Sequence, residues 1–160
     1  MRIALDTNII AYAEGVNDDH HQDAARQLLR QLPRDSTVLP VQVLGELFNV
    51  ILRKTNRSRV EARQSLLHWS DAFLLAPTTP GTMVDAADLA VDHGLGIWDA
   101  VILTVAAEAN CRLLLSEDMH EGFTWHGVTV TNPFAATRHP LLDSILGANG
   151  FHGGDTSIGG

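Results

Sequence analysis

Several features are scarce in this chain of 160 residues, and each absence removes a class of function. Cys111 is the only cysteine, so no internal disulfide can form, and a thiol in an apolar run is expected to be buried. Lys54 is the only lysine, and the GxxxxGK[ST] phosphate loop is missing. No apolar run approaches membrane-spanning length, and the first residues lack the pattern of a secretory signal. We therefore expect a cytoplasmic protein with no membrane partner.

Positive charge is scarce as well. The net charge is −8 and the isoelectric point is near 5.3, which argues against a broad basic surface that binds nucleic acid by charge alone. One small basic cluster remains, and it has two interpretations: its cations stabilise the dipole at a helix C-terminus, or they grip RNA phosphates. The cluster consists of Arg53, Lys54, Arg57, Arg59 and Arg63.

The order of apolar and amphipathic segments predicts an α/β fold. Apolar residues make up 45% of the chain, enough for one sizeable core. Strands that alternate with helices favour a mostly parallel sheet flanked by helices on both faces. Strands are predicted at 2–5, 36–39, 73–76, 111–115 and 128–131, and helices at 19–32, 40–54, 58–73, 82–93 and 98–110.

Local signals fix several boundaries. Pro40 suits the first position of a helix, Ser58 and Glu61 form a capping box, and Gly94 is a typical helix stop. We assign residues 1–137 to one domain. Residues 138–160 are assigned to a glycine-rich tail that is expected to be disordered.

Four acidic residues stand where apolar elements begin, end or are interrupted. Asp6 follows the first strand, and Asp118 follows the strand that ends in LLL. Asp99 opens a helix, and Glu46 interrupts the apolar side of another. In an open parallel sheet, ligands bind outside the carboxyl ends of the strands, where the strand order reverses. These acids are therefore candidates for one shared site.

Burial of such acids would be costly. An unpaired buried carboxylate loses several kcal/mol of hydration, so it is normally paired, protonated or bound to a cation. No arginine or lysine near any of the four in the sequence is an obvious partner. If the acids converge, their mutual repulsion raises their pKa values unless a divalent ion compensates. Oxygen ligands without cysteine or clustered histidine favour Mg²⁺ or Mn²⁺ over zinc.

Structural interpretations of the same acids stay open. Asp6 could simply cap the next helix, and Asp99 suits a helix N-terminus electrostatically. Asp118 is an ordinary residue for a turn after a strand. Glu46 is the hardest to explain this way, because it stands among Leu44, Leu47 and Phe48. No structural role is evident that would offset the cost of placing a carboxylate on this apolar face.

Four short motifs together resemble one family. LDTN at the first strand end, GEL in the third helix, WDA at the start of a late helix and SED after the next strand resemble the PIN domain, specifically VapC-type toxins. The similarity extends from residue 2 to about residue 134. It implies a single PIN-like α/β domain.

The resemblance also implies a site and an activity. Asp6, Glu46, Asp99 and Asp118 match the acidic quartet that binds one or two Mg²⁺ or Mn²⁺ ions in the family. Asn8 matches a polar residue beyond the first acid, and Ser116 matches a hydroxyl residue at the strand end. Glu117 lies between Ser116 and Asp118 in an extended segment and is expected to point elsewhere. The implied function is endonucleolytic cleavage of single-stranded RNA, in tRNA or ribosomal RNA, by a homodimeric toxin that a cognate antitoxin silences.

Two alternatives belong to other classes. A catalytically silent module of the same fold could hold a basic partner peptide in its acidic groove, but such a binder would not need Glu46 in an apolar helix. Phosphate transfer through an aspartyl nucleophile would require an acid two residues after Asp6 and a later lysine. Asn8 occupies the first position, and no lysine follows Lys54.

The remaining aromatic and imidazole side chains receive no site role. Trp98 could stack on a base, but an aromatic between two apolar elements is expected in the core. His20 and His21 are adjacent on a helix and point in different directions, so they form a poor chelate and are predicted to lie on a solvated face. His120 is interpreted as a surface residue of a turn.

Overall fold

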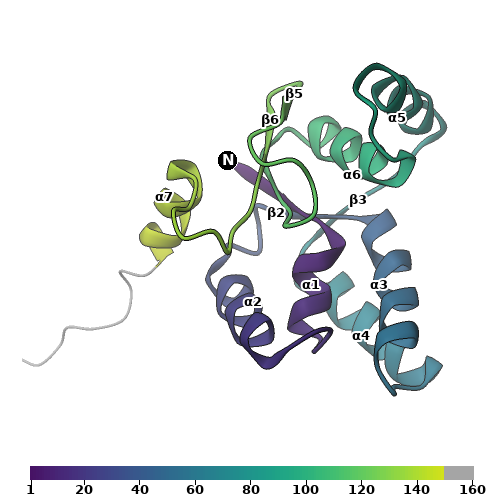
Figure 1. Ribbon diagram of the computed structural model, residues 1–160, viewed down its shortest axis with the longest axis vertical. Helices are drawn as coiled ribbons and strands as arrows, with labels where there is room; N and C mark the ends of the chain where they lie inside the picture. The colour runs from purple at the N-terminus through teal and green to yellow at the C-terminus, as the bar shows by residue number, and fades with distance from the viewer. Residues whose placement is uncertain (150–160) are drawn as a thin grey trace, which may run out of the picture.

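The computed structural model describes residues 1–149, which form a six-stranded sheet with helices on both sides (Figure 1). The strand order is β3-β2-β1-β4-β6-β5, and every pairing is parallel except that of β5 with β6. The α/β class predicted from the sequence is confirmed. The strands are β1 Arg2–Leu5, β2 Thr37–Pro40, β3 Leu74–Ala76, β4 Cys111–Leu115, β5 Thr124–Trp125 and β6 Val128–Thr131.

Capping signals mark the helix ends as predicted. Ser58 and Glu61 form a reciprocal capping box, and Gly94 ends its helix in the left-handed conformation at φ 67°, which a glycine adopts without strain. The helices are α1 Thr7–Ala13, α2 Asp19–Gln31, α3 Val41–Lys54, α4 Arg59–Ala72, α5 Pro80–His93, α6 Ile97–Glu108 and α7 Pro140–Asn149.

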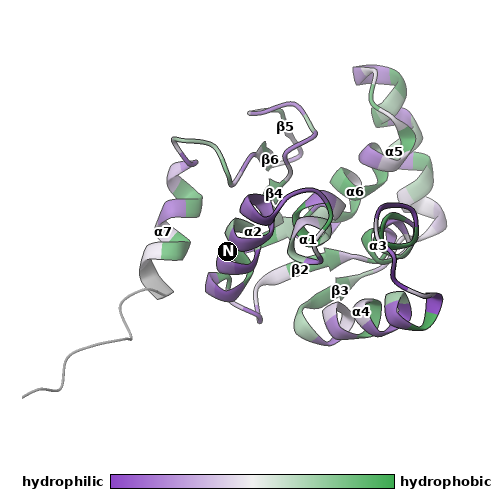
Figure 2. Ribbon diagram, turned by 60° about the horizontal axis from the view of Figure 1, so that its bottom comes forward, coloured by the Kyte–Doolittle hydropathy of each residue, from purple (hydrophilic) through white to green (hydrophobic). Residues whose placement is uncertain are grey.

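The topology places a switch point between β1 and β4. The chain runs from β1 outward through β2 to β3, then crosses back over the sheet to β4. Because parallel crossovers are right-handed, the return path through α5 and α6 lies on the face opposite the helices of the outward path. Figure 2 shows α6 and α4 on opposite sides of β2 and β3. A crevice therefore opens where the order reverses, outside the carboxyl ends of β1 and β4.

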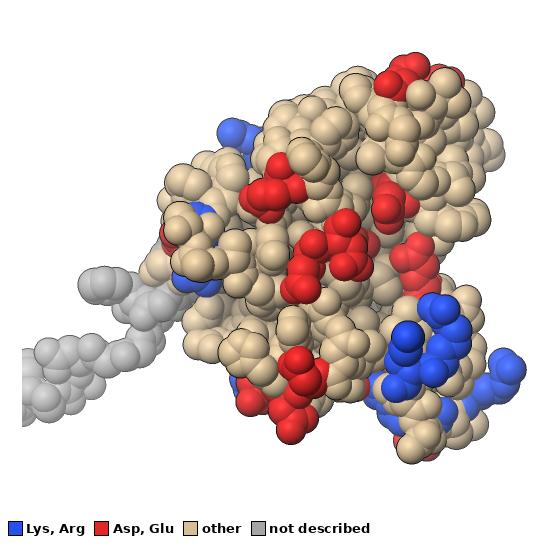
Figure 3. All heavy atoms as spheres, in the orientation of Figure 1, with Lys and Arg blue, Asp and Glu red and all other residues tan. Residues whose placement is uncertain are grey.

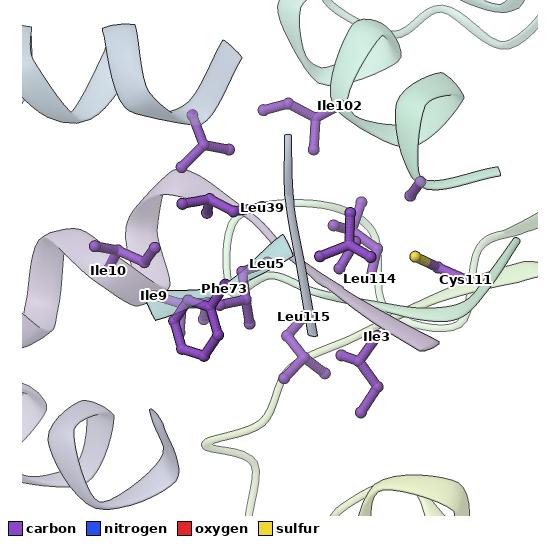
Figure 4. Packing of buried hydrophobic residues seen from close by; sticks show 14 of the residues in the cluster. Ile3, Leu5, Ile9, Ile10, Leu39, Phe73, Ile102, Cys111, Leu114 and Leu115 are labelled. Carbon is purple, nitrogen blue, oxygen red and sulfur yellow. The ribbon is translucent and has the colours of Figure 1, made fainter. Parts of the chain in front are cut away.

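The core is built from the apolar strands and the helices α1 to α7 that cover them. Ile3 and Leu5 from β1 pack with Leu114 from β4, and Ile102 of α6 closes the cluster from one face (Figure 4). Cys111 is buried in the same cluster, as expected, and burial raises the pKa of its thiol to about 11. The cysteine thus behaves as a small apolar residue.

Three local features differ from the prediction. The helix 7–13 is missing from it, because its TNIIAYA sequence is buried nearly all round and shows no helical periodicity. The two-residue strand 124–125 is too short to leave a pattern. Pro40 is the last residue of β2 and not the first of α3, a shift of one position that lies within the usual uncertainty of helix ends.

The assignment of residues 138–160 to a disordered tail is wrong for its first part. Residues 140–149 form α7, and Leu142 and Leu146 of this helix join the core at 0% and 6% exposure. The apolar spacing of PLLDSIL is a short helical pattern that the glycines after it obscured. Residues 150–160 lie outside the described residues.

A substitution at Leu142 tests directly whether α7 is part of the folded domain. Leu142→Ala should lower the free energy of unfolding by about 2–4 kcal/mol, because a buried leucine leaves a cavity. Urea unfolding measures the change, with Leu67→Ala on exposed α4 as the control. A loss below about 0.5 kcal/mol, as for a surface site, would contradict the packing of α7.

Within residues 1–149, no single helix is long and apolar enough to cross a membrane. One pair of helices, α5 with α6, meets the test by length and composition, but it is bent by 118° at its break.

Candidate active site

The first candidate acid, Asp6, lies at the switch point. Leu5 pairs with Leu115 in the register of β1 and β4, so Asp6 and Ser116 are the next residues of two neighbouring strands. The Asp6 amide donates to the Leu115 carbonyl at 3.0 Å. The Ser116 hydroxyl donates to Asp6 Oδ2 at 2.6 Å, and the Thr7 amide donates to Asp6 Oδ1 at 2.7 Å. Asp6 thus caps α1 and also presents a fixed carboxylate.

The environment of Asp6 disfavours its charge. The residue is 5% exposed and forms no ion pair within residues 1–149. Burial raises its pKa to about 6 and outweighs the hydrogen bonds from Ser116 and Thr7, which lower it. The charges of Asp99 and Glu46 raise the pKa further. A cation in this crevice would remove the cost of ionising Asp6.

Glu46 reaches the same crevice from α3. Its neighbours Leu44 and Leu47 are buried, and the glutamate itself is half-buried on the side facing α1. Thr7 Oγ1 donates to Glu46 Oε2 at 2.5 Å, and Gln42 Nε2 donates to Oε1 at 3.2 Å. Both donors are neutral, so they hold the carboxylate in place without neutralising it.

Asp99 and Asp118 complete the group but are exposed. Asp99 lies in the first turn of α6, and Asp118 follows β4. Loss of water around the Asp99 carboxyl raises its pKa, with further contributions from Glu46 and Asp118. The prediction that burial is costly for all four acids is therefore corrected. Only Asp6 is deeply buried and Glu46 is half-buried, whereas the other two open toward solvent, although the Asp99 carboxyl still loses part of its water.

All four acids line one pocket of about 500 Å³ between α1 and α3. Figure 3 shows acidic atoms gathered over the middle of this face. No ion pair within residues 1–149 involves any of the four acids. In the same part of the chain, no three acidic, histidine or cysteine side chains stand close enough to form a ready-made metal cage. The four acids therefore share one pocket without forming a preformed cage in the described chain.

Asn8 and Glu117 support this arrangement. Asn8 Nδ2 lies 3.5 Å from both Asp6 Oδ2 and Ser116 Oγ, and the Glu117 amide donates to Asn8 Oδ1 at 3.3 Å. The Glu117 carboxylate accepts from Tyr12 Oη at 3.1 Å. Glu117 is outside the pocket lining, in agreement with the prediction that it points elsewhere.

The basic cluster divides into two parts. Arg57 is held by Glu14 in an ion pair of 2.6 Å, so its guanidinium is already engaged. Arg53 lines the acidic pocket, two helical turns from Glu46, and Lys54 and Arg59 are exposed nearby. Figure 3 shows the blue atoms at the far ends of α3 and α4. Arg63, also exposed, belongs to the same surface.

Two predictions about ring side chains are wrong. Trp98 is 52% exposed instead of part of the core, because it is in the first turn of α6, before that helix enters the sheet packing. His21 is half-buried: its ring lies 4.7 Å from that of Tyr12, and its Nδ1 lies 2.8 Å from Asp18. His20 is exposed, as predicted.

Among the polar residues that the sequence analysis missed, three lie next to Glu46. Thr7 and Gln42 hold Glu46, and Asn49 lines the pocket between Glu46 and Arg53. The spacing around Glu46 contains the signal for the two residues on its helix, since positions i−4, i+3 and i+7 share its face. Thr7 left no signal, because its role depends on a contact between α1 and α3.

The arrangement of acids at the switch point agrees with a family model that matches residues 3–120, that of the PIN domain. The chain belongs to the PIN domain family. Solved structures that are similar to this PIN domain include the three described next. VapC20 from Mycobacterium tuberculosis, a sarcin-ricin loop cleaving toxin, has a TM-score of 0.62 at 19% identity and covers 72% of this chain and 89% of its own.

The other two are complexes. VapBC2 from Rickettsia felis, bound to a promoter DNA fragment, has a TM-score of 0.60 at 17% identity, over 82% of this chain and 98% of its own. FitAB bound to the IR36 DNA fragment has a TM-score of 0.62 at 21% identity, over 86% and 99%. At these identities the likeness shows a shared fold. No curated protein matches this PIN domain in sequence.

Proposed function

We propose that this PIN domain is a Mg²⁺- or Mn²⁺-dependent endoribonuclease that cuts single-stranded regions of tRNA or ribosomal RNA. The observation that carries the proposal is the pocket of about 500 Å³ at the switch point, which four carboxylates line without a protein cation among them. A structural ion-pair network would contain its own arginine or lysine partners. Within residues 1–149, the one arginine that lines this pocket, Arg53, is two helical turns from Glu46 at the end away from the acids.

The donor set fits one or two hard divalent cations. Asp6, Glu46, Asp99 and Asp118 would hold the metal, since carboxylate oxygens are preferred ligands of Mg²⁺ and Mn²⁺. Burial raises the pKa of Asp6 and the charges of Asp99 and Glu46 raise it further, so a bound cation would favour the ionised carboxylate. A bound ion would supply Lewis acidity and positive charge for phosphodiester hydrolysis.

The other residues of the pocket position these carboxylates. Ser116 and the Thr7 amide fix the two oxygens of Asp6, and Thr7 Oγ1 and Gln42 fix those of Glu46. Asn8 holds the segment after β4 through the Glu117 amide. Hydrolysis adds water across the P–O bond, and the leaving oxygen takes a proton. No side-chain nucleophile is needed.

The far end of the pocket is suited to the RNA backbone. Glu46, Asn49 and Arg53 follow one another along one face of α3, over roughly 10 Å. We assign phosphate contacts to Arg53, Lys54 and Arg59, which are exposed and form no ion pair in the described chain. Arg57 is left out of this group because Glu14 engages it.

The biological setting is part of the same proposal. The similar structures include a toxin and toxin–antitoxin complexes. We infer that this PIN domain is a cytoplasmic toxin of the VapC type, that it forms a homodimer, and that a cognate antitoxin covers its acidic pocket. An arginine of the antitoxin inserted among the carboxylates would provide the missing cation.

Cleavage of a mixture of bulk tRNA and ribosomal RNA tests the activity. The purified protein should cut with Mg²⁺ or Mn²⁺ and stop in EDTA. Glu46→Gln and Asp99→Asn should each lower the rate at least about 100-fold, the scale of loss when a group that stabilises the transition state is removed. Asp85→Asn on exposed α5 is the matched control and should cut normally.

The same assay can refute the proposal. Equal cutting by the wild type and both pocket variants would point to a contaminating nuclease. No cutting of any RNA, combined with no metal binding by calorimetry, would favour the silent module that holds a basic peptide.

A further inference from the structure

Trp98 is an aromatic side chain without a partner. It is 52% exposed, and within residues 1–149 its ring contacts no other ring and its indole N–H donates no hydrogen bond. The other two tryptophans are engaged. Trp69 donates to Glu14 and stacks on Phe73, and Trp125 stacks on His126. Only Trp98 among the three is not packed against the core.

The position of Trp98 connects it to the acidic pocket. It directly precedes Asp99, which lines that pocket. Because α6 leads into β4 and runs back along the sheet, the first turn of α6 lies at the carboxyl edge of the strands, where Asp6 also lies. Ile97, the residue before Trp98, is 36% exposed. Two exposed apolar side chains, Ile97 and Trp98, therefore border the end of the pocket where the acids lie.

The net negative charge of the molecule bears on how RNA can bind near Trp98. With a net charge of −8, attraction to phosphates contributes little to RNA binding away from the metal and the basic cluster. Stacking of a base on an aromatic face depends little on charge and tolerates any sequence. It also requires an unpaired base, since bases in a duplex are already stacked on one another.

We propose that Trp98 stacks on an unpaired base of the RNA strand whose backbone enters the acidic pocket. This inference rests on the proposed function, because it assumes that the strand passes Asp99. Trp98 is then a positioning and selecting residue: it favours single-stranded RNA and holds the nucleotide next to the one that is cut. It takes no part in bond breaking.

Binding assays with two probes separate stacking from phosphate contacts. One probe is a fluorescent 12-nucleotide oligouridine, which forms no internal pairs, and the other is a 12-unit ribose-phosphate strand without bases. The Glu46→Gln background keeps the strands intact. Trp98→Ala should weaken oligouridine binding about 5- to 150-fold, the range for loss of one stacked base. Binding of the baseless strand should not change.

Matched variants sharpen the result. Trp98→Phe should keep most of the affinity for oligouridine, because a smaller aromatic ring still stacks. Leu67→Ala, at a residue that is 54% exposed on α4, should have no effect on either probe. Quenching of tryptophan fluorescence by oligouridine should be smaller in Trp98→Phe than in the protein that keeps Trp98.

Several outcomes would overturn the inference. Equal losses on both probes, or no loss on either, would show that the ring does not contact a base. A dimer that becomes a monomer in Trp98→Ala, with unchanged affinity for oligouridine, would assign the ring to an interface between two copies. If the wild-type protein cuts no RNA but binding still depends on Trp98, the nuclease proposal fails while the stacking contact stands.

Discussion

Replacing Asp6 with asparagine is expected to abolish RNA cleavage and at the same time to stabilise the metal-free protein. Asparagine keeps the shape of the side chain, still caps α1 by accepting from the Thr7 amide, and carries no charge. A change that merely damaged the fold would lower both activity and stability. Opposite signs therefore distinguish a residue kept for chemistry from one kept for structure.

The stability gain depends on pH. The pKa of Asp6 rises from 3.8 to about 6 in the folded protein, so the folded state binds its proton more tightly than the unfolded state does. The contribution of Asp6 to stability is therefore fully present below pH 3.8 and is lost as the pH rises through 6. The difference between the two pKa values corresponds to about 3 kcal/mol.

Thermal unfolding in EDTA at pH 4 and pH 8 measures this effect. At pH 8, Asp6→Asn should melt roughly 5–10 °C above the wild type, and at pH 4 the two should nearly coincide. Asp23→Asn, at an exposed position of α2, should match the wild type at both values. Mn²⁺ should raise the melting temperature of the wild type but not that of Asp6→Asn. A variant less stable than the wild type at pH 8 would show that the charge of Asp6 is compensated inside the protein.

The sequence indicated which acids come together better than it indicated the edges of the fold. Asp6 and Asp118 could be placed at one sheet edge because each follows an apolar run, and parallel strands end together. Glu46 was identifiable because a charge interrupts an apolar helical face. The switch point itself requires the strand order, which depends on pairings between distant segments such as Leu5 with Leu115.

The exposure of single residues could not be read from local patterns. Trp98 was predicted in the core because its neighbours are apolar, but its position in the first turn of α6 leaves it at the rim. Arg57 was grouped with the other cations, although its partner Glu14 lies 43 residues away. Contacts of this kind form only when α1, α3 and α4 are packed together. The sequence therefore shows the charge of Arg57 but not its partner.

The second large expected effect is the loss of stability when Arg57 is replaced. Its Nη1 donates to Glu14 Oε2 at 2.6 Å, and its Nη2 donates to the Glu14 carbonyl at 2.7 Å. The other oxygen of Glu14 accepts from Trp69 Nε1 at 2.6 Å. The side chain of Glu14 is only 14% exposed. Three elements meet here: the end of α1, the turn after α3, and α4.

Arg57→Ala should therefore cost about 2–4 kcal/mol of unfolding free energy, because it leaves a nearly buried carboxylate with one donor fewer. The melting temperature should fall by roughly 5–15 °C. Arg59→Ala, two residues away and exposed, is the matched control and should change stability by less than about 0.5 kcal/mol. In Glu14→Gln, the further loss on Arg57→Ala should be smaller, since the charge that Arg57 compensates is absent.

Alanine variants of Arg53, Arg57 and Arg59 separate a structural role from RNA binding. Arg53→Ala and Arg59→Ala should weaken RNA binding and lower its dependence on salt without changing the melting temperature, as expected for phosphate contacts. Arg57→Ala should change the melting temperature first, and should affect cleavage only because α1 and α3 form the walls of the acidic pocket. If Arg57→Ala left stability intact and reduced RNA affinity as much as Arg59→Ala, its guanidinium would have to leave Glu14 to bind RNA. The Arg57–Glu14 ion pair would then be a contact that RNA replaces, and it would not be needed to stabilise the packing of α1 and α3 around the pocket.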